Sequence, residues 1–257
     1  MLVYEGEEMM KCGEYLKKYK SIIVFDCETN GLDFNTCQII ELAAIKIGID
    51  INGDMFVEKE FDKFISLPEG KRLPSKIIEL TGISDNMLKN EGFAKDVIAR
   101  EFLELVDGST LLIAHNAQFD ALFLLSLLKG YDFPSFDYLD TLTIFKDRRA
   151  YPHKLSDAII AYGLENKVIN SHRAIDDVCA LMEVLKEMIM ERDDIHTYIN
   201  IFGYNPKFGV SGKKITGIQY AAHKYNNDMT DENNTLPALL DKKQDVYTQL
   251  SFGSDLI

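Results

Sequence analysis

The apolar stretch at residues 21–27 constrains the fold of this chain more than any other feature. It is rich in β-branched residues, contains Asp26 near its end, and is followed by an Asn30-Gly31 turn. A run of this kind is typical of a strand that is buried on both faces of a sheet. We therefore expect residues 21–27 to form the central strand, with other elements packed on both of its sides.

Two more strands are expected to follow as a hairpin, at residues 37–49 and 55–65. Apolar and other residues alternate through the first of them, and Asn52-Gly53 supplies the turn between the two. The chain then alternates short strands with helices, which indicates a mixed sheet covered by helices, an α/β fold. The further strands are expected at residues 110–114 and 138–142, and the helices at residues 74–81, 84–88, 94–106, 116–128, 154–162 and 174–191.

The pattern weakens beyond about Ile195. Glycines and an Asn205-Pro206 pair divide this region into loops with one or two short strands, and residues 226–234 are polar. We therefore expect a main domain at residues 1–195 and a loop-rich, partly flexible C-terminal extension at residues 196–257.

The composition limits how this chain can bind a partner. A formal net charge of −13 and a pI near 4.8 argue against binding nucleic acid by overall electrostatic attraction. Nucleic acid would have to be bound through local contacts, such as bound cations and a small basic patch. The four cysteines show no CxxC pairing, and Cys27 and Cys179 are expected to be buried. The N-terminus lacks the order of a signal peptide, and no apolar stretch is long enough to span a bilayer. A soluble cytoplasmic protein is expected.

Several carboxylates stand where burial would be costly without a cation. Asp26 and Glu28 point to the same side at the end of the first strand. Either a structural salt bridge or a metal ion could compensate their repulsion. Asp120 lies in an apolar helical stripe with Phe123 and Leu124, and an unpaired buried carboxylate costs several kcal/mol or more.

The helix expected at residues 174–191 begins with two aspartates that differ in their surroundings. The face of Asp177 continues through apolar residues, whereas that of Asp176 turns toward solvent. Asp177 is therefore the candidate ligand. His172 lies just before this helix. A lone histidine is usually structural, but beside acidic groups it suits proton abstraction near neutral pH.

The ordered set of these motifs resembles the DEDDh family of 3′–5′ exonucleases, which includes the epsilon and PolC-type proofreading exonucleases of bacterial DNA polymerase III. The resemblance covers roughly the first three-quarters of the chain and implies a ribonuclease H-like mixed five-stranded sheet flanked by helices. It implies that two Mg²⁺ or Mn²⁺ ions are bound by four carboxylates, with a histidine as the general base. The matching positions are Asp26, Glu28, Asp120 and Asp177 for the carboxylates and His172 for the base.

The same resemblance implies how a single-stranded 3′ end is held. The matching positions are Thr29, Asn30, Gly31, Leu32, His115 and Asn116, although for Asn116 helix capping is the stronger reading. The basic segment at residues 146–154, with Arg148, Arg149 and Tyr151, is expected to border the cleft and contact phosphates. Asp140 is not assigned as a ligand, and its role is expected to be structural.

Three alternatives stay open on the sequence. The substrate could be RNA, since contacts to a 2′-hydroxyl cannot be read from sequence. The chain could instead be a non-catalytic protein that associates with a polymerase or a sliding clamp. The tail residues Gln249, Leu250 and Phe252 loosely resemble clamp-binding peptides, and the rival reading is that they dock on the body of the protein.

Overall fold

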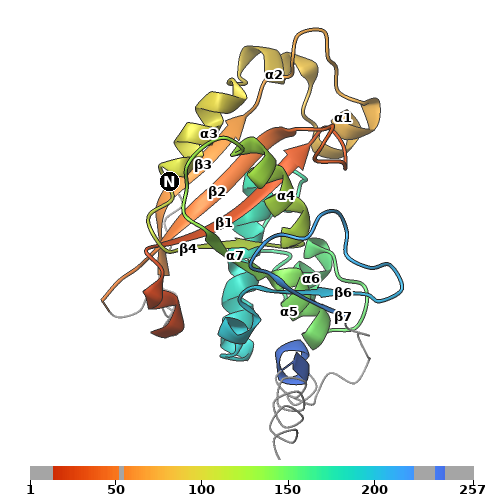
Figure 1. The fold of residues 1–257 in the computed structure, drawn as a ribbon. Coiled ribbons are helices and arrows are strands. Elements are labelled where there is room, and N and C mark those ends of the chain that lie inside the picture. The colour runs from red at the N-terminus through yellow and green to blue at the C-terminus, as the bar shows by residue number, and fades with distance from the viewer. Residues whose placement is uncertain (1–13, 52–54, 223–234, 241–257) are drawn as a thin grey trace, which may run out of the picture.

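A computed structural model describes residues 14–51, 55–222 and 235–240 of this chain. Its centre is a five-stranded mixed sheet with the order β3-β2-β1-β4-β5 (Figure 1), which confirms the expected α/β architecture. The β1–β2 and β2–β3 pairs are antiparallel, and β4 and β5 continue the sheet parallel to β1. The strands are β1 (Ser21–Thr29), β2 (Ile39–Ile49), β3 (Met55–Phe64), β4 (Thr110–Ala114) and β5 (Phe136–Asp140).

Helices cover both faces of this sheet, so β1 is buried on both sides as its sequence predicts (Figure 1). Ile22 and Val24 pack into a core with α5 (Thr141–Arg148), α6 (Leu155–Ala161) and α7 (Ala174–Glu191). Ile23 and Phe25 pack on the opposite face against α3 (Lys95–Leu103) and α4 (Ala117–Leu127). Burial of this much apolar side-chain surface fixes β1 in the middle of the molecule.

A smaller apolar cluster lies at the start of β2. It joins Ile40 to Leu73, Ile83 and Leu88 around α1 (Ser75–Thr81) and α2 (Asp85–Asn90). The Ser84 hydroxyl caps α2 by accepting a hydrogen bond from the backbone of Met87, as its sequence position predicts.

The carboxyl ends of β1, β4 and β5 meet at one edge of the sheet because these three strands run parallel. Polar groups gather at this edge in open α/β sheets. At this edge Asp140 ends β5 and accepts backbone hydrogen bonds from both Asn116 and Leu142, so that it caps α4 and α5 together. This is the structural role expected for Asp140.

Helix α5 was not expected, and it overturns the role predicted for Arg148. The residues after Asp140 form a helix, and the Arg148 side chain is only 3% exposed. It pairs with Glu191 and Asp194 and donates to the backbone oxygens of Met188 and Arg192 at the end of α7. A guanidinium enclosed in this way ties α5 to α7 and cannot reach a phosphate.

Arg149 is also engaged away from the sheet edge. Its guanidinium lies 2.7 Å from Glu191 and stacks over the ring of Tyr162. The prediction that this arginine pair borders the cleft is therefore wrong. The sequence predicts one basic segment beside the cleft at residues 146–154, whereas helix α5 takes up the first three of them.

The region after residue 195 packs onto the main sheet. It contains a 3₁₀ turn (Ile195–Tyr198) and a parallel two-stranded sheet of β6 (Ile201–Tyr204) and β7 (Gln219–Ala222). Asn200 donates to Asp137, and the backbone of Gly203 donates to Thr143. The expected Asn52-Gly53 turn and the tail residues Gln249, Leu250 and Phe252 lie outside the described residues.

Two smaller observations complete the fold. Cys27 is buried as expected, but Cys179 is exposed on α7, so that prediction was wrong. Within the described residues, no helix has both the length and the apolar character that crossing a bilayer requires.

Replacing Arg148 with methionine tests its role in the fold. The change leaves Asp194 and two backbone oxygens without their buried donor, so we expect the free energy of unfolding to fall by about 3 kcal/mol. Chemical denaturation measures it. The matched control, Arg72→Met at an exposed position, should stay within about 0.5 kcal/mol of wild type. Equal effects of the two changes on the free energy of unfolding would contradict a structural role for Arg148.

Candidate active site

Three carboxylates meet at the carboxyl end of β1. Asp26 and Glu28 come from β1 itself, and Asp120 reaches this strand from the first turn of α4. The backbone N–H and the thiol of Cys27, which lies between the two β1 acids, donate to Asp120 Oδ1 at 3.3 and 3.1 Å. Asp120 is therefore held against β1 by the residue that separates Asp26 from Glu28.

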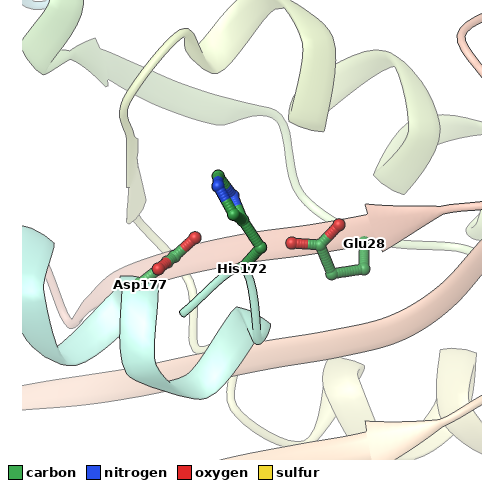
Figure 2. Close-up of side chains that lie close together, drawn as sticks. All are labelled: Glu28, His172 and Asp177. Atoms are coloured by element: carbon green, nitrogen blue, oxygen red, sulfur yellow. The ribbon is translucent and has the colours of Figure 1, made fainter. Parts of the chain in front are cut away.

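A fourth carboxylate, Asp177, comes from the first turn of α7 and is buried. Side-chain atoms of Glu28, His172 and Asp177 lie within 4.8 Å of one another. Figure 2 shows the His172 ring between Glu28 on β1 and Asp177 on α7. The side chain of Asn170 also donates to Asp177, at 2.7 Å.

Burial is the largest cause of the raised pKa of all four carboxylates, and neighbouring carboxylate charges add to it. Burial, followed by the charges of Asp120, Asp177 and Glu28, raises the pKa of Asp26 well above its ordinary value. Burial and then Asp177 raise the pKa of Glu28 to about 8. Burial outweighs the hydrogen bonds from Cys27 and raises the pKa of Asp120 to about 7. Burial raises the pKa of Asp177 to about 6, because its effect is larger than the lowering effect of the nearby His172.

These shifts describe a site that needs positive charge. Within the described residues, no salt bridge joins Asp26, Glu28, Asp120 or Asp177 to a lysine or arginine. Clustered carboxylate oxygens are the ligands that hard divalent cations such as Mg²⁺ and Mn²⁺ prefer. The donor set therefore fits a divalent metal centre.

His172 lies on a loop that a partly buried ion pair fixes in place. Glu41 on β2 is directly opposite Glu28 in the sheet and is fully buried. Arg173 donates to both Glu41 oxygens, with its closest contact at 2.6 Å, and the Ala174 N–H donates to Glu41 Oε2 at 2.9 Å. This contact holds the start of α7 on β2 and presents His172, whose φ is 57°, over the site.

The last residue of β1 and the loop that follows contain four positions predicted to bind substrate, and hydrogen bonds define the shape of this segment. Thr29 donates to the backbone of Gly31 at 2.7 Å, and Asn30 accepts from the backbone of Gln38 at 2.8 Å. Gly31 leaves no room for a side chain, since a Cβ there would lie 2.5 Å from the sulfur of Cys37. Leu32 follows with 85% of its surface exposed, so it is the member free to contact a ligand.

His115 and Asn116 lie near this edge in supporting positions. The His115 ring is half-buried, with Nδ1 3.0 Å from Thr141 and Nε2 3.0 Å from the backbone oxygen of His153. Both ring nitrogens are therefore engaged within the protein. Asn116 occupies the helix-cap position with φ 73°, but its side chain makes no cap bond; its backbone N–H instead donates to Asp140.

Sequence reasoning missed three residues that build the site: Glu41, Arg173 and Cys27. A signal existed for the first two, because Glu41 is a carboxylate inside an apolar strand and Arg173 directly follows the predicted catalytic histidine. Nothing in the sequence pairs them across 132 positions. The contact of Cys27 with Asp120 requires the packing of α4 on β1, which the sequence pattern did not specify.

Residues 23–185 match the family model described as exonuclease, RNase_T. The PolC-type DNA polymerase III proteins of Clostridium perfringens and Bacillus subtilis are 34% and 35% identical to this chain, over 76% and 68% of its length. These relatives are much longer. The chain spans only 13% and 12% of their lengths.

Solved structures share the fold. The zinc-bound complex of Escherichia coli exonuclease I with single-stranded DNA superposes with a TM-score of 0.59 at 16% identity, covering 70% of this chain and 42% of that one. Cell-death related nuclease 4 (CRN-4) superposes with a TM-score of 0.55 at 18% identity, covering 67% of this chain and 64% of that one. These likenesses support the five-stranded architecture.

The raised pKa of Asp120 predicts a pH-dependent effect of Asp120→Asn in chelator. Below about pH 4, the pKa of aspartate in the unfolded chain, Asp120 is protonated in both states and does not destabilise the fold. Above about pH 7, its pKa in the folded protein, its ionisation destabilises the fold to the full extent. The free energy of unfolding of Asp120→Asn relative to wild type should therefore rise between pH 4 and 7, by on the order of 2–4 kcal/mol. Denaturation at several pH values measures this.

The control for that measurement is the cation itself. Adding Mn²⁺ should raise the melting temperature of the wild type at pH 7.5 and have little effect on Asp120→Asn. A relative stability that is flat with pH, together with equal metal effects on both proteins, would contradict a site built around an unpaired carboxylate.

The Glu41–Arg173 contact predicts a loss of turnover in Arg173→Lys. Lysine keeps the charge but cannot bind both Glu41 oxygens, so the loop that carries His172 loosens. We expect kcat to fall at least about 10-fold, with KM changed less than threefold and the melting temperature within a few degrees of wild type. The control, Lys63→Arg on β3, should leave both kinetic constants unchanged. An Arg173→Lys variant with wild-type kcat would contradict this positioning role.

Proposed function

This chain belongs to the exonuclease family and is a 3′–5′ exonuclease, and on that premise we propose that it trims single-stranded DNA from the 3′ end, releasing nucleoside 5′-monophosphates. The observation that carries the proposal is the convergence of Asp26, Glu28, Asp120, Asp177 and His172 at one end of β1. The alternative of a non-catalytic protein that keeps the fold is not favoured, because all four carboxylates and the histidine are present.

The four carboxylates are proposed to hold two divalent ions, Mg²⁺ or Mn²⁺. When bound, such ions lower the pKa of a water molecule and stabilise charge on the leaving oxygen. The fit rests on the raised pKa values of the carboxylates and on their lack of a lysine or arginine partner among the described residues. Asp26 and Glu28 approach from the strand, and Asp120 and Asp177 from two helices.

His172 is proposed as the general base. Its ring lies within 4.8 Å of Glu28 and Asp177, it is exposed to solvent, and imidazole is the side chain best suited to exchange protons near neutral pH. It would accept the proton of the attacking water as the new O–P bond forms and the bond from phosphorus to the 3′ oxygen breaks. The carboxylate of Asp177 would stabilise the imidazolium that results.

The terminal nucleotide is proposed to lie over the loop at Thr29, Asn30, Gly31 and Leu32. This loop directly follows Glu28, and Leu32 presents an apolar side chain to solvent. His115 and Asn116 are proposed to act indirectly, by shaping the start of α4, the helix from which Asp120 projects. Arg148 and Arg149 have no part in this proposal, because both are engaged with the end of α7.

The biological setting is proposed to be proofreading or repair in the cytoplasm, in association with a DNA polymerase. The support is the similarity to two PolC-type polymerases, together with free cysteines at positions 27, 37 and 179, which suit a reducing compartment. Residues 1–195 are proposed as the nuclease domain, with residues 196–257 as an extension of it.

Asp26→Asn tests the catalytic centre. We expect the rate of 3′ trimming of a 5′-labelled single strand to fall at least 100-fold, because a ligand of the cations is lost. Chelator should abolish the wild-type activity. The control, Asp193→Asn, removes an exposed acid beyond α7 and should keep the wild-type rate.

Matched DNA and RNA strands in the same assay decide the substrate class. Faster release of ribonucleotides would replace the DNA proposal with an exoribonuclease. Full activity in Asp26→Asn, or in chelator, would end the metal-dependent mechanism altogether.

A further inference from the structure

A cavity of about 480 Å³ lies beside the proposed active site, between the loop after β1, helix α4 and a loop of the C-terminal region. Its volume falls within the roughly 300–1,000 Å³ that is usual for small-molecule sites. The loop after β1 contributes Leu32 and Phe34, α4 contributes Phe119 and Phe123, and the C-terminal region contributes Gly212 and Lys213. Asp120 directly follows Phe119 on α4, although no carboxylate of the acidic cluster lines the cavity itself.

The C-terminal wall of this cavity is tied to α4. Gln118, two positions before Asp120, donates from its amide nitrogen to the backbone oxygens of Ser211 and Lys213 at 2.9 and 2.8 Å. Tyr220 donates to the Gln118 amide oxygen at 2.6 Å, and the backbone of Ile215 donates to Tyr220. Residues 205–218 pass beside α4 between β6 and β7 (Figure 1). The wall is therefore built into the structure.

Gly212 brings this wall close to the helix. Its φ is 71°, and a Cβ would lie 2.8 Å from Leu122 on α4. Only glycine meets both conditions without strain. The next residue, Lys213, is exposed at the rim of the cavity.

The lining matches the chemistry of a nucleotide. Phe34 and Phe119 are partly exposed aromatic side chains, and Leu32 adds an exposed apolar surface, which is the kind of lining on which a flat base stacks. Lys213 supplies positive charge at the rim in a chain whose formal net charge is −13. Asp33 also lines the cavity, but its carboxylate accepts hydrogen bonds from Asn35 and Thr36.

We propose that the loop at residues 211–213 forms one wall of a nucleobase subsite, and that Lys213 contacts a phosphate of the strand being shortened. The inference rests on the proposed single-stranded DNA substrate. It assigns the C-terminal region a direct part in substrate binding, although the match to the exonuclease family model ends at residue 185.

Lys213→Gln tests this with steady-state kinetics on a single-stranded oligothymidylate. We expect KM to rise three- to tenfold with kcat within twofold of wild type. The slope of log KM against log salt concentration should fall by about 0.7, the value for one lost phosphate contact on a single strand. The control, Lys207→Gln, changes an exposed lysine that does not line the cavity and should leave KM and its slope unchanged.

Gln118→Leu tests the wall without changing charge. Loss of its bonds to residues 211 and 213 should raise KM at least threefold while leaving the salt slope at its wild-type value. Melting curves establish that each variant is folded. Wild-type KM and salt dependence in both folded variants would overturn the proposal.

A binding measurement separates this proposal from the proposed function. Fluorescence anisotropy of a labelled oligothymidylate, in an Asp26→Asn background with Mg²⁺ present, reports affinity without cleavage. If the wild type did not cleave DNA but Lys213→Gln bound the oligothymidylate more weakly, the result would contradict the proposed function and support the subsite. Cleavage by the wild type with unchanged affinity and KM in Lys213→Gln would end the subsite and leave the function standing.

Discussion

Electrostatic repulsion among buried carboxylates at the end of β1 is the constraint on which the rest of this structure depends. Burial is the largest cause of the raised pKa of Asp26, Glu28, Asp120 and Asp177, and the charges of neighbouring carboxylates raise the pKa of Asp26 and Glu28 further. A flexible scaffold would relieve such repulsion by moving the side chains into water. Here β1 is fixed between two apolar cores, so the carboxylates stay close together. Bound cations would compensate their negative charge.

The neighbouring Glu41 shows how the same problem is solved without a metal ion. It is directly opposite Glu28 and fully buried, yet a bidentate contact from Arg173 and a backbone N–H satisfy its oxygens. The guanidinium that neutralises it also anchors the residue next to His172. The ion pair therefore leaves Glu41 with a structural role, whereas the other carboxylates stay available for metal. The same contact positions His172, the candidate base.

The parts of the site that could be predicted from sequence depend on local periodicity. Asp120 and Asp177 lie on apolar helical stripes, and both are buried in the structure as that spacing indicates. Contacts between distant segments could not be predicted in this way. Arg148 appeared to belong to a basic loop because its partners, Glu191 and Asp194, lie 43 and 46 positions away. Its charge indicated a phosphate contact, whereas tertiary packing determines its role.

The proposed function requires an acidic chain to bind a polyanionic strand, and short-range contacts would make this possible. Net charge governs long-range attraction, which salt screens within about 10 Å at ordinary ionic strength, so contacts at the site decide binding. The acidic cluster itself becomes favourable to phosphate only when cations are bound there. In the proposed subsite, Lys213 and the aromatic side chains would act at short range, independently of the net charge of the whole chain. The C-terminal region matters in this respect because it places Lys213 beside α4, the helix that also carries Asp120.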